Sequence, residues 1–186
     1  MTDPAADPQD AAAMGGDMPG RDADFDLAFP PIPLPSPRVL AVAGEPLLRQ
    51  LIRCQHERLR ASSIRNLFPA DPGNFAAVVE RIGNFVIEIV SGSPQTAQSR
   101  LLTWFRARHL PITIDETARN VWLAAMYFAF DDVGFPDEAR LEFWNWVEAL
   151  SIRAVTRRTM INQPRRYPLD EAATALRPFS SAHAPK

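Results

Sequence analysis

The feature that most constrains the fold is residues 114–131, a stretch that would be apolar on nearly every side of a helix. One helical stripe holds Ala118, Val121, Trp122, Ala125 and Ala129, and a second holds Leu123, Tyr127 and Phe130. A helix that is apolar all round has to be covered by protein on all sides. We therefore predict a buried central helix, with the rest of the domain built around it.

The segments on either side are also helical in pattern. Residues 45–60 carry an apolar stripe that includes Gln55, and residues 72–90 follow Asp71, a good N-cap, and Pro72, suited to a first helical position. A short turn is expected over 64–68, a weaker helix over 96–108, and a last helix over 136–159. Alternation of apolar and polar residues never lasts five positions. The sequence therefore predicts an all-α domain.

Composition limits the function classes. The chain has 186 residues, 46% of them apolar, which is enough for one buried core. Residues 39–162 hold fourteen arginines against thirteen acids, and this near-neutral balance argues against nucleic acid as a partner. No apolar run is long enough for a membrane helix, and Cys54 is the single cysteine. We expect a cytoplasmic protein with no membrane partner.

Both ends of the chain have the composition of tails. Residues 1–38 contain eight of the eighteen prolines and are predicted to be a disordered leader, rich in proline and aspartate. The run from Phe29 to Pro37 favours polyproline II and could dock to a proline-recognising partner, although a leader without such a role is the simpler interpretation. We place the folded domain at 39–162 and a flexible C-terminal tail at 163–186.

The break between the weak helix and the central one contains His109, one of three histidines. Pro111 disfavours the α region for Leu110, so the helix that carries His109 is expected to end there. Thr113 and Glu116 have the spacing of a capping box that would open the next helix. Taken alone, His109 suits a helix C-terminus, where its charge interacts well with the helix dipole. The alternative is a metal ligand, because neutral imidazole is a usual ligand of haem iron.

The order of several short motifs resembles the group II truncated haemoglobins. The resemblance covers residues 45 to 158. Its landmarks are Phe68-Pro69, Glu80-Arg81-Ile82, Arg108-His109-Leu110-Pro111, Ile114-Asp115 with Arg119, and Val121-Trp122-Leu123. Membership of that family implies a shortened globin fold, a two-over-two helical sandwich, that holds haem b.

The resemblance also implies roles for individual residues. His109 would be the proximal iron ligand. The residues expected to contact haem are Phe68, Arg81, Ile82, Phe85, Arg108, His109, Ile114 and Trp122, with the two arginines placed for the haem propionates. The distal residues expected to face a bound gas are Gln55, Val78 and Trp122.

The chain departs from the family on the distal side. The tyrosine expected in the first distal helix is missing, and family spacing leads to Gln55 instead. The apolar stripe independently turns Gln55 inward. An amide can donate to a bound ligand but holds it less firmly than a phenol, so bound oxygen should leave faster than from a tyrosine-containing relative. His56, next to Arg53 and near Arg49 and Arg60, is expected on the solvated face.

Three functional interpretations follow. The first is a globin that binds O₂, NO or CO, with NO-detoxifying or redox activity as an option and an electron-donor reductase as partner. The second is a haem-based sensor or adaptor that signals through its tails. The third is a globin-shaped interaction module that has lost haem. No general acid or base can be assigned beyond Gln55, so catalysis is not predicted as the main role, and the oligomeric state is left open.

Overall fold

The computed structural model describes residues 31–92, 105, 109 and 111–180. Its regular elements are α1 (Pro37–Arg60), the 3₁₀ helix η2 (Arg65–Leu67), α2 (Pro72–Ser91), α5 (Glu116–Asp132), α6 (Asp137–Ala154) and α7 (Leu169–Ser180). No strand occurs in these described ranges. The all-α prediction is confirmed.

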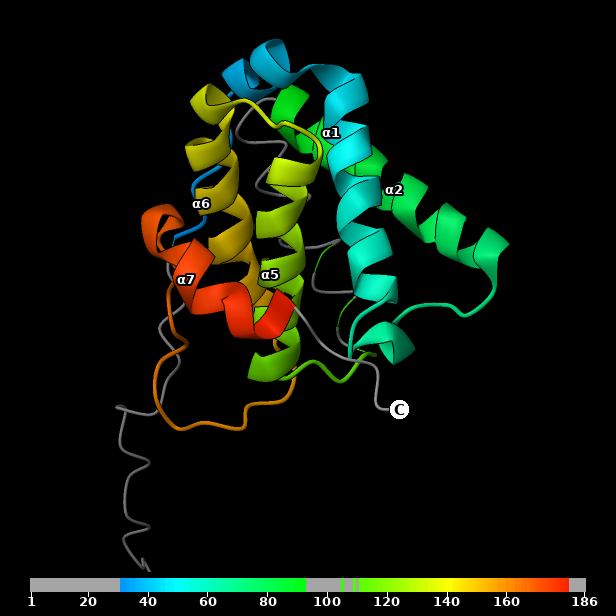
Figure 1. Cartoon of the computed structure of the whole chain (residues 1–186), viewed down its shortest axis with the longest axis vertical. Coiled ribbons are helices and arrows are strands. Elements are labelled where there is room, and N and C mark those ends of the chain that lie inside the picture. Colours follow the sequence, from blue (N-terminus) through cyan, green and yellow to red (C-terminus); the bar gives the residue numbers. More distant parts are fainter. Residues whose placement is uncertain (1–30, 93–104, 106–108, 110, 181–186) are drawn as a thin grey trace, which may run out of the picture.

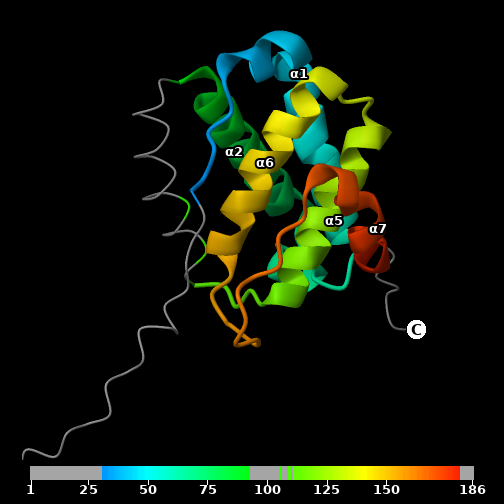
Figure 2. The same cartoon turned by 90° about the vertical axis from the view of Figure 1, so that its left-hand side faces the viewer.

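The helices form two packed pairs, α1 with α2 and α5 with α6, and α7 packs beside the second pair (Figures 1 and 2). Helix α1 packs against α2 and also against α5 and α6, while α7 lies on the outer side of α5. Helix α5 therefore has protein neighbours on three sides. Its residues Leu123, Ala124, Ala129 and Phe130 are fully buried. The predicted central helix is confirmed.

Helix α1 begins earlier than predicted and contains a kink. Gly44 has φ 74° and ψ 153°, and Pro46 follows it. Positive φ is readily adopted only by glycine, and a proline is tolerated in the first turn of the helical stretch that follows. The predicted start near residue 45 therefore matches the second part of α1.

The first part of α1 and the residues before it belong to the core. Val39 is fully buried, and Ile32 and Leu34 pack against the main apolar cluster. The backbone N–H of Ser36 also donates to Glu142 of α6. The prediction of a disordered leader is wrong for residues 31–38, because the apolar residues between the prolines pack against the main apolar cluster. Residues 1–30 lie outside the described residues.

The N-termini of α2 and α5 are capped by aspartates. The Asp71 carboxylate accepts from the N–H of Asn74 at 2.8 Å, as predicted, with Pro72 in the first turn. In α5 the cap is Asp115, whose Oδ1 accepts from the N–H of Ala118 at 2.8 Å. The predicted capping box at Thr113 is wrong.

Glu116 has a different role from the one that the capping box assigns to it. Its carboxylate accepts from the Thr159 N–H at 3.0 Å and from Arg158 Nε at 3.0 Å. Thr156 contributes to the same junction, since its Oγ1 donates to the Ile112 carbonyl at 2.6 Å. These contacts hold the chain after α6 against the start of α5. Helix α6 thus ends at Ala154 rather than near residue 159.

The segment after residue 162 is folded. Tyr167, Ala172 and Leu176 are buried, and the indole Nε1 of Trp144 donates to the Tyr167 carbonyl at 2.7 Å. The prediction of a flexible tail is wrong for residues 163–180. Pro168 directly precedes α7, a position that a helix tolerates, and Pro178 lies near the C-terminal end of α7, so the proline spacing does not prevent a helix. Residues 181–186 lie outside the described residues.

Two other predictions concern the helix before His109 and the absence of a membrane helix. Apart from Phe105, the predicted helix over 96–108 lies outside the described residues. Among the helices that are described, none is long and apolar enough to cross a bilayer.

Candidate functional site

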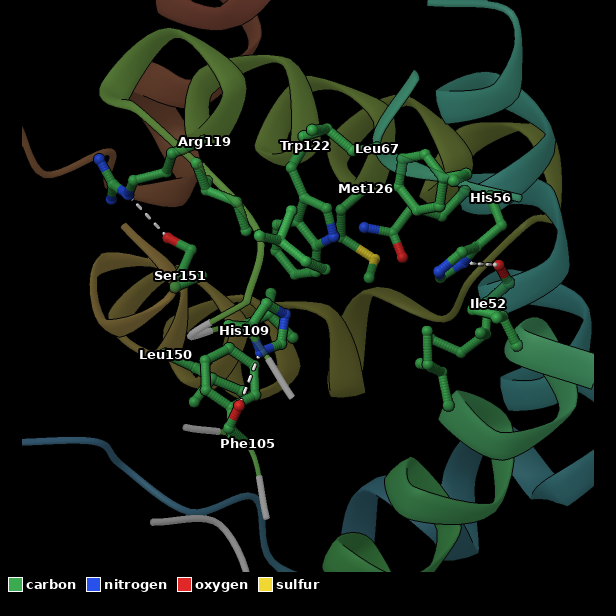
Figure 3. A pocket seen from close by; sticks show the side chains of 18 of the residues that line it. Ile52, His56, Leu67, Phe105, His109, Arg119, Trp122, Met126, Leu150 and Ser151 are labelled. Carbon is green, nitrogen blue, oxygen red and sulfur yellow. Dashed lines mark hydrogen bonds between the residues drawn. The ribbon is translucent and has the colours of Figure 1, made fainter. Parts of the chain in front are cut away.

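A cavity of about 410 Å³ lies between α1, α2, α5 and α6 (Figure 3). This volume falls within the range of pockets that hold small molecules and cofactors. Most of its wall is apolar, and residues from segments far apart in the sequence meet there. Its lining includes Gln55, His56, Phe68, Val78, Arg81, Ile82, Phe85, Phe105, His109, Ile114, Arg119, Trp122 and Trp146.

One ring nitrogen of His109 has a fixed hydrogen-bond partner, so the other nitrogen is the candidate ligand atom. Its Nδ1 lies 2.7 Å from the Phe105 carbonyl oxygen, which can only accept, so Nδ1 carries the proton. The Phe105 ring lies 4.1 Å from the imidazole, centroid to centroid. Neutral His109 then has a bare Nε2, the atom that a metal would bind.

The protonation state of His109 suits the same role. Burial lowers the pKa of His109 below its ordinary value, and the hydrogen bond to the Phe105 carbonyl offsets part of that effect. The ring is therefore neutral near pH 7. A neutral imidazole with an oriented tautomer is what an iron ligand requires.

Gln55 is a buried polar group with no partner among the described residues. It is fully buried, and neither its Nε2 nor its Oε1 has a hydrogen bond. The inward position predicted from the apolar stripe is confirmed. Leaving a buried polar group unsatisfied costs about 1–3 kcal/mol. A bound ligand that bonds to this amide would remove that cost.

His56 lies in the same cavity, contrary to the prediction that it is solvated. It is 2% exposed, and its Nδ1 lies 2.7 Å from the Ile52 carbonyl oxygen. The rings of Phe68 and Phe75 contact it edge-on, at 5.9 and 6.5 Å between centroids. The prediction is wrong because α2 and the segment after α1 cover this side of α1. Burial lowers the pKa of His56, with a smaller opposing effect from its hydrogen bond.

The residues predicted to contact a cofactor meet at this cavity wherever they are described. Phe85 is buried, Phe68 and Trp122 are half-buried, and Arg81 is exposed. Others that line the cavity are Val78, Ile82 and Ile114, all half-buried. Arg108 lies outside the described residues. In the view of Figure 3, Trp122 and Met126 lie between the His109 and His56 sides of the cavity.

Arg119 and Trp146 also line the cavity and were not predicted as part of the site. Arg119 is 3% exposed, and its guanidinium donates to Ser151 Oγ at 2.8 Å and to Glu148 at 2.8 Å. Arg119 is a landmark of the family resemblance, but its partners on α6 carry no sequence signal of their own. Trp146 is 1% exposed, and its Nε1 has no partner within the described part of the chain.

Comparison with known proteins decides the family. The family model for bacterial-like globins matches residues 41–156, which is more than half of the chain. The chain belongs to the bacterial-like globin family. The globin is 30% identical, over 120 residues, to the group 2 truncated hemoglobin YjbI of Bacillus subtilis (strain 168). That alignment covers 64% of the globin and 85% of the relative. The predicted resemblance is confirmed.

Solved structures agree with this assignment. The globin matches phosphate-bound Hell's gate globin IV with a TM-score of 0.72 and 42% identity, over 82% of its own length and 94% of that chain. It matches the group II truncated hemoglobin from Bacillus anthracis with a TM-score of 0.54 over 70% of its length and 95% of that chain. The second match, at 23% identity, supports the fold alone. The globin fold class is confirmed, and membership of the family makes this a haem-binding globin.

The cavity fits such a cofactor. It combines one neutral imidazole with a bare nitrogen, aromatic and aliphatic walls, and a buried amide without a partner. Arg81 lies at its exposed edge, where a guanidinium can pair with a carboxylate. These are the kinds of groups that a flat, largely apolar iron cofactor with carboxylate side chains requires.

Proposed function

We propose that this globin binds O₂ reversibly, together with NO and CO, at a haem b iron ligated by His109. The observation that carries the proposal is His109 itself. Burial favours its neutral form by lowering its pKa, its Nδ1 is fixed on the Phe105 carbonyl, which leaves Nε2 unprotonated, and the ring lines a cavity that also holds an unpartnered amide. When bound, haem b supplies an iron that coordinates a diatomic gas.

The protein would orient the cofactor from several sides. His109 would hold the iron, while Phe68 and Phe85 would contact the porphyrin face from the α1–α2 side of the cavity. Arg81 and Arg108 are proposed partners of the two propionates. The guanidinium geometry suits a carboxylate, and Arg81 already lies at the exposed edge.

The distal side would provide hydrogen-bond donors to the gas. Trp122 and Gln55 both line the cavity, and each carries an N–H group that can donate to bound oxygen. Val78 adds an apolar neighbour without a polar atom. We propose that Trp122 gives the dominant hydrogen bond and Gln55 a weaker one, because an unanchored amide is the more flexible donor.

Removing either donor should accelerate oxygen release. Trp122→Phe keeps an aromatic ring and deletes the indole N–H, while Gln55→Leu keeps the approximate shape and deletes the amide. A neutral hydrogen bond contributes about 0.5–1.5 kcal/mol. Oxygen dissociation should therefore become about two- to twelvefold faster, because each ~1.4 kcal/mol is a factor of ten. Stopped-flow dissociation rates of the ferrous oxygen complex measure the effect.

Carbon monoxide provides the control for these variants. It is a poorer hydrogen-bond acceptor, so its dissociation rate should change much less in both. Equal oxygen dissociation rates in Trp122→Phe and the parent would contradict the assignment of Trp122. Equal acceleration for both gases would show a change of cavity shape rather than the loss of a hydrogen bond.

Sensing is a second candidate, and one observation favours it. Arg119 lines the cavity and also donates to the Arg165 carbonyl at 2.7 Å, so one side chain joins the cavity to the segment before α7. If a gas changes the position of Arg119, amide hydrogen exchange in residues 165–176 should differ between the ferrous and CO-bound forms. Identical hydrogen exchange in both forms would contradict sensing through Arg119 and would leave gas binding as the proposed function.

The physiological setting is part of the proposal. A ferrous globin that exchanges oxygen needs an electron-donor reductase to reverse oxidation of its iron. The single cysteine, Cys54, supports a reducing compartment and thus a cytoplasmic location. NO detoxification would use the same ferrous site and the same reductase.

A further inference from the structure

The chain between α6 and α7, residues 155–168, has an apolar tip that the rest of the described chain leaves exposed. In this α6–α7 loop, Ile161 is 86% exposed and Met160 is 50% exposed. Figures 1 and 2 show the loop at the end of the domain where α5 begins. Single exposed apolar side chains are ordinary on protein surfaces, but two neighbours at the tip of an ordered loop mark a contact site.

Hydrogen bonds hold the backbone of this tip in one conformation. The guanidinium of Arg158 donates to the carbonyl oxygens of Met160 at 3.0 Å and of Asn162 at 2.5 Å. Arg158 is itself fixed on Glu116, which also accepts from the Thr159 N–H at 3.0 Å. A loop that is already ordered loses little conformational entropy when a partner binds to it. The tip is therefore preorganised for contact.

The surface around the tip carries excess positive charge. Residues 149–169 contain five arginines and no acidic residue. Two of these arginines are balanced by salt bridges to carboxylates of α5 and α6. Arg157 and Arg165 are exposed, and neither has a salt bridge within the described part of the chain. The guanidinium of Arg165 lies 5.1 Å from the centroid of the Tyr167 ring, a contact that leaves its charge in place.

The start of the same loop is bonded to the wall of the cavity. The Thr156 N–H donates to the Ile114 carbonyl at 2.9 Å, and Thr156 Oγ1 donates to the Ile112 carbonyl at 2.6 Å. Ile112 and Ile114 both line the cavity, on the chain that follows His109. A protein bound at the tip is therefore close to the cofactor site. That position suits a partner that exchanges electrons with the cofactor, because electrons pass between proteins only over short distances.

We propose that the tip of the α6–α7 loop binds an acidic face of the flavoprotein that donates electrons to this globin. Met160 and Ile161 enter an apolar recess of the donor, and Arg157 and Arg165 pair with carboxylates around it. An apolar centre inside a charged rim is the usual arrangement of such contacts. One electron passes from the donor's reduced flavin to the ferric iron, which becomes ferrous, and no bond forms or breaks. The inference rests on the proposed function.

An anionic lipid surface has the same sign of charge, and the loop fits it less well. Stable attachment to a membrane surface takes an amphipathic helix or two separate signals, such as a lipid chain with a polybasic segment. The tip offers two apolar side chains and two unbalanced arginines. Transient electron-transfer contacts are small, typically below about 1,200 Å². The observations therefore favour an acidic protein.

The binding test uses oxidised flavodoxin, a small acidic flavoprotein, as the probe for the full chain. Isothermal titration calorimetry at low ionic strength compares the parent with the double variant Arg157→Glu/Arg165→Glu and with Ile161→Ser. We expect both variants to bind at least about tenfold more weakly than the parent. Binding by the parent should weaken as salt is added, because salt screens exposed charges. This measurement does not depend on the activity of the haem.

Matched controls lie on other faces of the molecule. Arg38→Glu/Arg53→Glu makes the same change of net charge at exposed positions of α1. Leu141→Ser removes an apolar side chain that is 56% exposed on α6. Both controls should bind flavodoxin as the parent does.

Electron transfer gives a second readout in the haem-loaded, ferric protein. Reduced flavodoxin should reduce the two loop variants at least about tenfold more slowly than the parent and the controls. Dithionite, a small reductant that needs no docking surface, should reduce all of them at one rate. Stopped-flow absorption in the Soret region follows both reactions.

The possible failures are distinguishable. A haem-loaded parent that does not bind flavodoxin, or loop variants that bind it as the controls do, would overturn this inference alone. Binding to phosphatidylglycerol vesicles that is lost in Ile161→Ser, without binding to flavodoxin, would overturn it in favour of a lipid surface. A parent that takes up no haem would overturn the proposed function, and this inference with it.

Discussion

His109→Gly is expected to lose most of its haem. The variant removes the imidazole next to Phe105. That imidazole has a tautomer fixed by the Phe105 carbonyl and an unprotonated Nε2. Loss of even an outer-shell partner typically lowers metal affinity 10–100-fold, so loss of the ligand itself should lower haem affinity by at least about 100-fold. The measurement is the ratio of Soret to protein absorbance after reconstitution with one equivalent of haem.

The space left by the deleted ring allows a rescue experiment with free imidazole. Added imidazole should enter the His109→Gly cavity and restore haem loading, because it replaces the missing ligand without a covalent link. The same concentration of imidazole should not raise loading of the parent. A His109→Gly protein with an unchanged ferrous spectrum and full loading without imidazole would contradict the assignment of His109.

The second large effect is expected at the buried ion pair of Arg119 and Glu148. Their side chains are 2% and 3% exposed, and their charged atoms lie 2.8 Å apart. Glu148 also accepts from Arg166 Nε at 2.7 Å and from the Tyr167 N–H at 3.2 Å. The pair therefore connects α5, α6 and the segment before α7 with charge-assisted hydrogen bonds.

Removing one partner should be far more harmful than removing both. Glu148→Ala leaves a buried guanidinium without its counter-charge, and breaking a buried pair in this way costs about 3–5 kcal/mol. Arg119→Met with Glu148→Leu replaces both charges by apolar groups, which is often close to neutral. We expect Glu148→Ala to lower the melting temperature by roughly 6–20 °C, given about 2–4 °C per kcal/mol at this size. Chemical denaturation of the parent, Glu148→Ala and the double variant measures the free energies of unfolding.

An exposed ion pair provides the matched control. Asp131 lies 2.8 Å from Arg140 but is 59% exposed, and surface pairs typically contribute about 0–1 kcal/mol. Asp131→Asn should therefore change stability little. If Glu148→Ala proved no more destabilising than Asp131→Asn, the buried network would not hold the C-terminal segment on the domain.

The elements that sequence predicted well are those fixed by local rules. Residues 72–90 follow an aspartate cap and a proline in the first turn, and the structure places α2 at Pro72–Ser91 with that cap. The apolar character of residues 114–131 required neighbours on several sides, and α5 has them. The same stripe argument placed Gln55 inward because its neighbours Leu51, Ile52 and Leu59 share one face.

The errors arose where tertiary contacts override local patterns. His56 lies three residues after Arg53, on the face of α1 that was expected to be polar. Helices α2, α5 and α6 cover α1 on more than one side, so less of that face is exposed than the sequence pattern indicates. Proline spacing favoured a flexible tail after 162, yet the buried carboxylate of Glu148 and the indole of Trp144 bind the backbone at Tyr167. Neither partner can be identified from the sequence near Tyr167.

In the candidate site, too, the sequence predicted some features and missed those that depend on tertiary contacts. Family resemblance supplied residues that the structure brings to one cavity, among them Phe68, His109 and Trp122. The hydrogen bonds that set their chemical properties depend on atomic positions, which the sequence does not give. The tautomer of His109 is set by the Phe105 carbonyl. The Gln55 amide has no hydrogen bond because no polar group of the described residues lies within reach of it.

The most direct test of the account is the absorption spectrum of the purified full chain in the ferric, ferrous and CO-bound forms. A red protein is predicted, with a Soret band that shifts on reduction and again on CO binding, and with one haem per chain. A colourless protein that does not take up added haem would contradict haem ligation by His109. It would leave the globin fold as a scaffold for some other function.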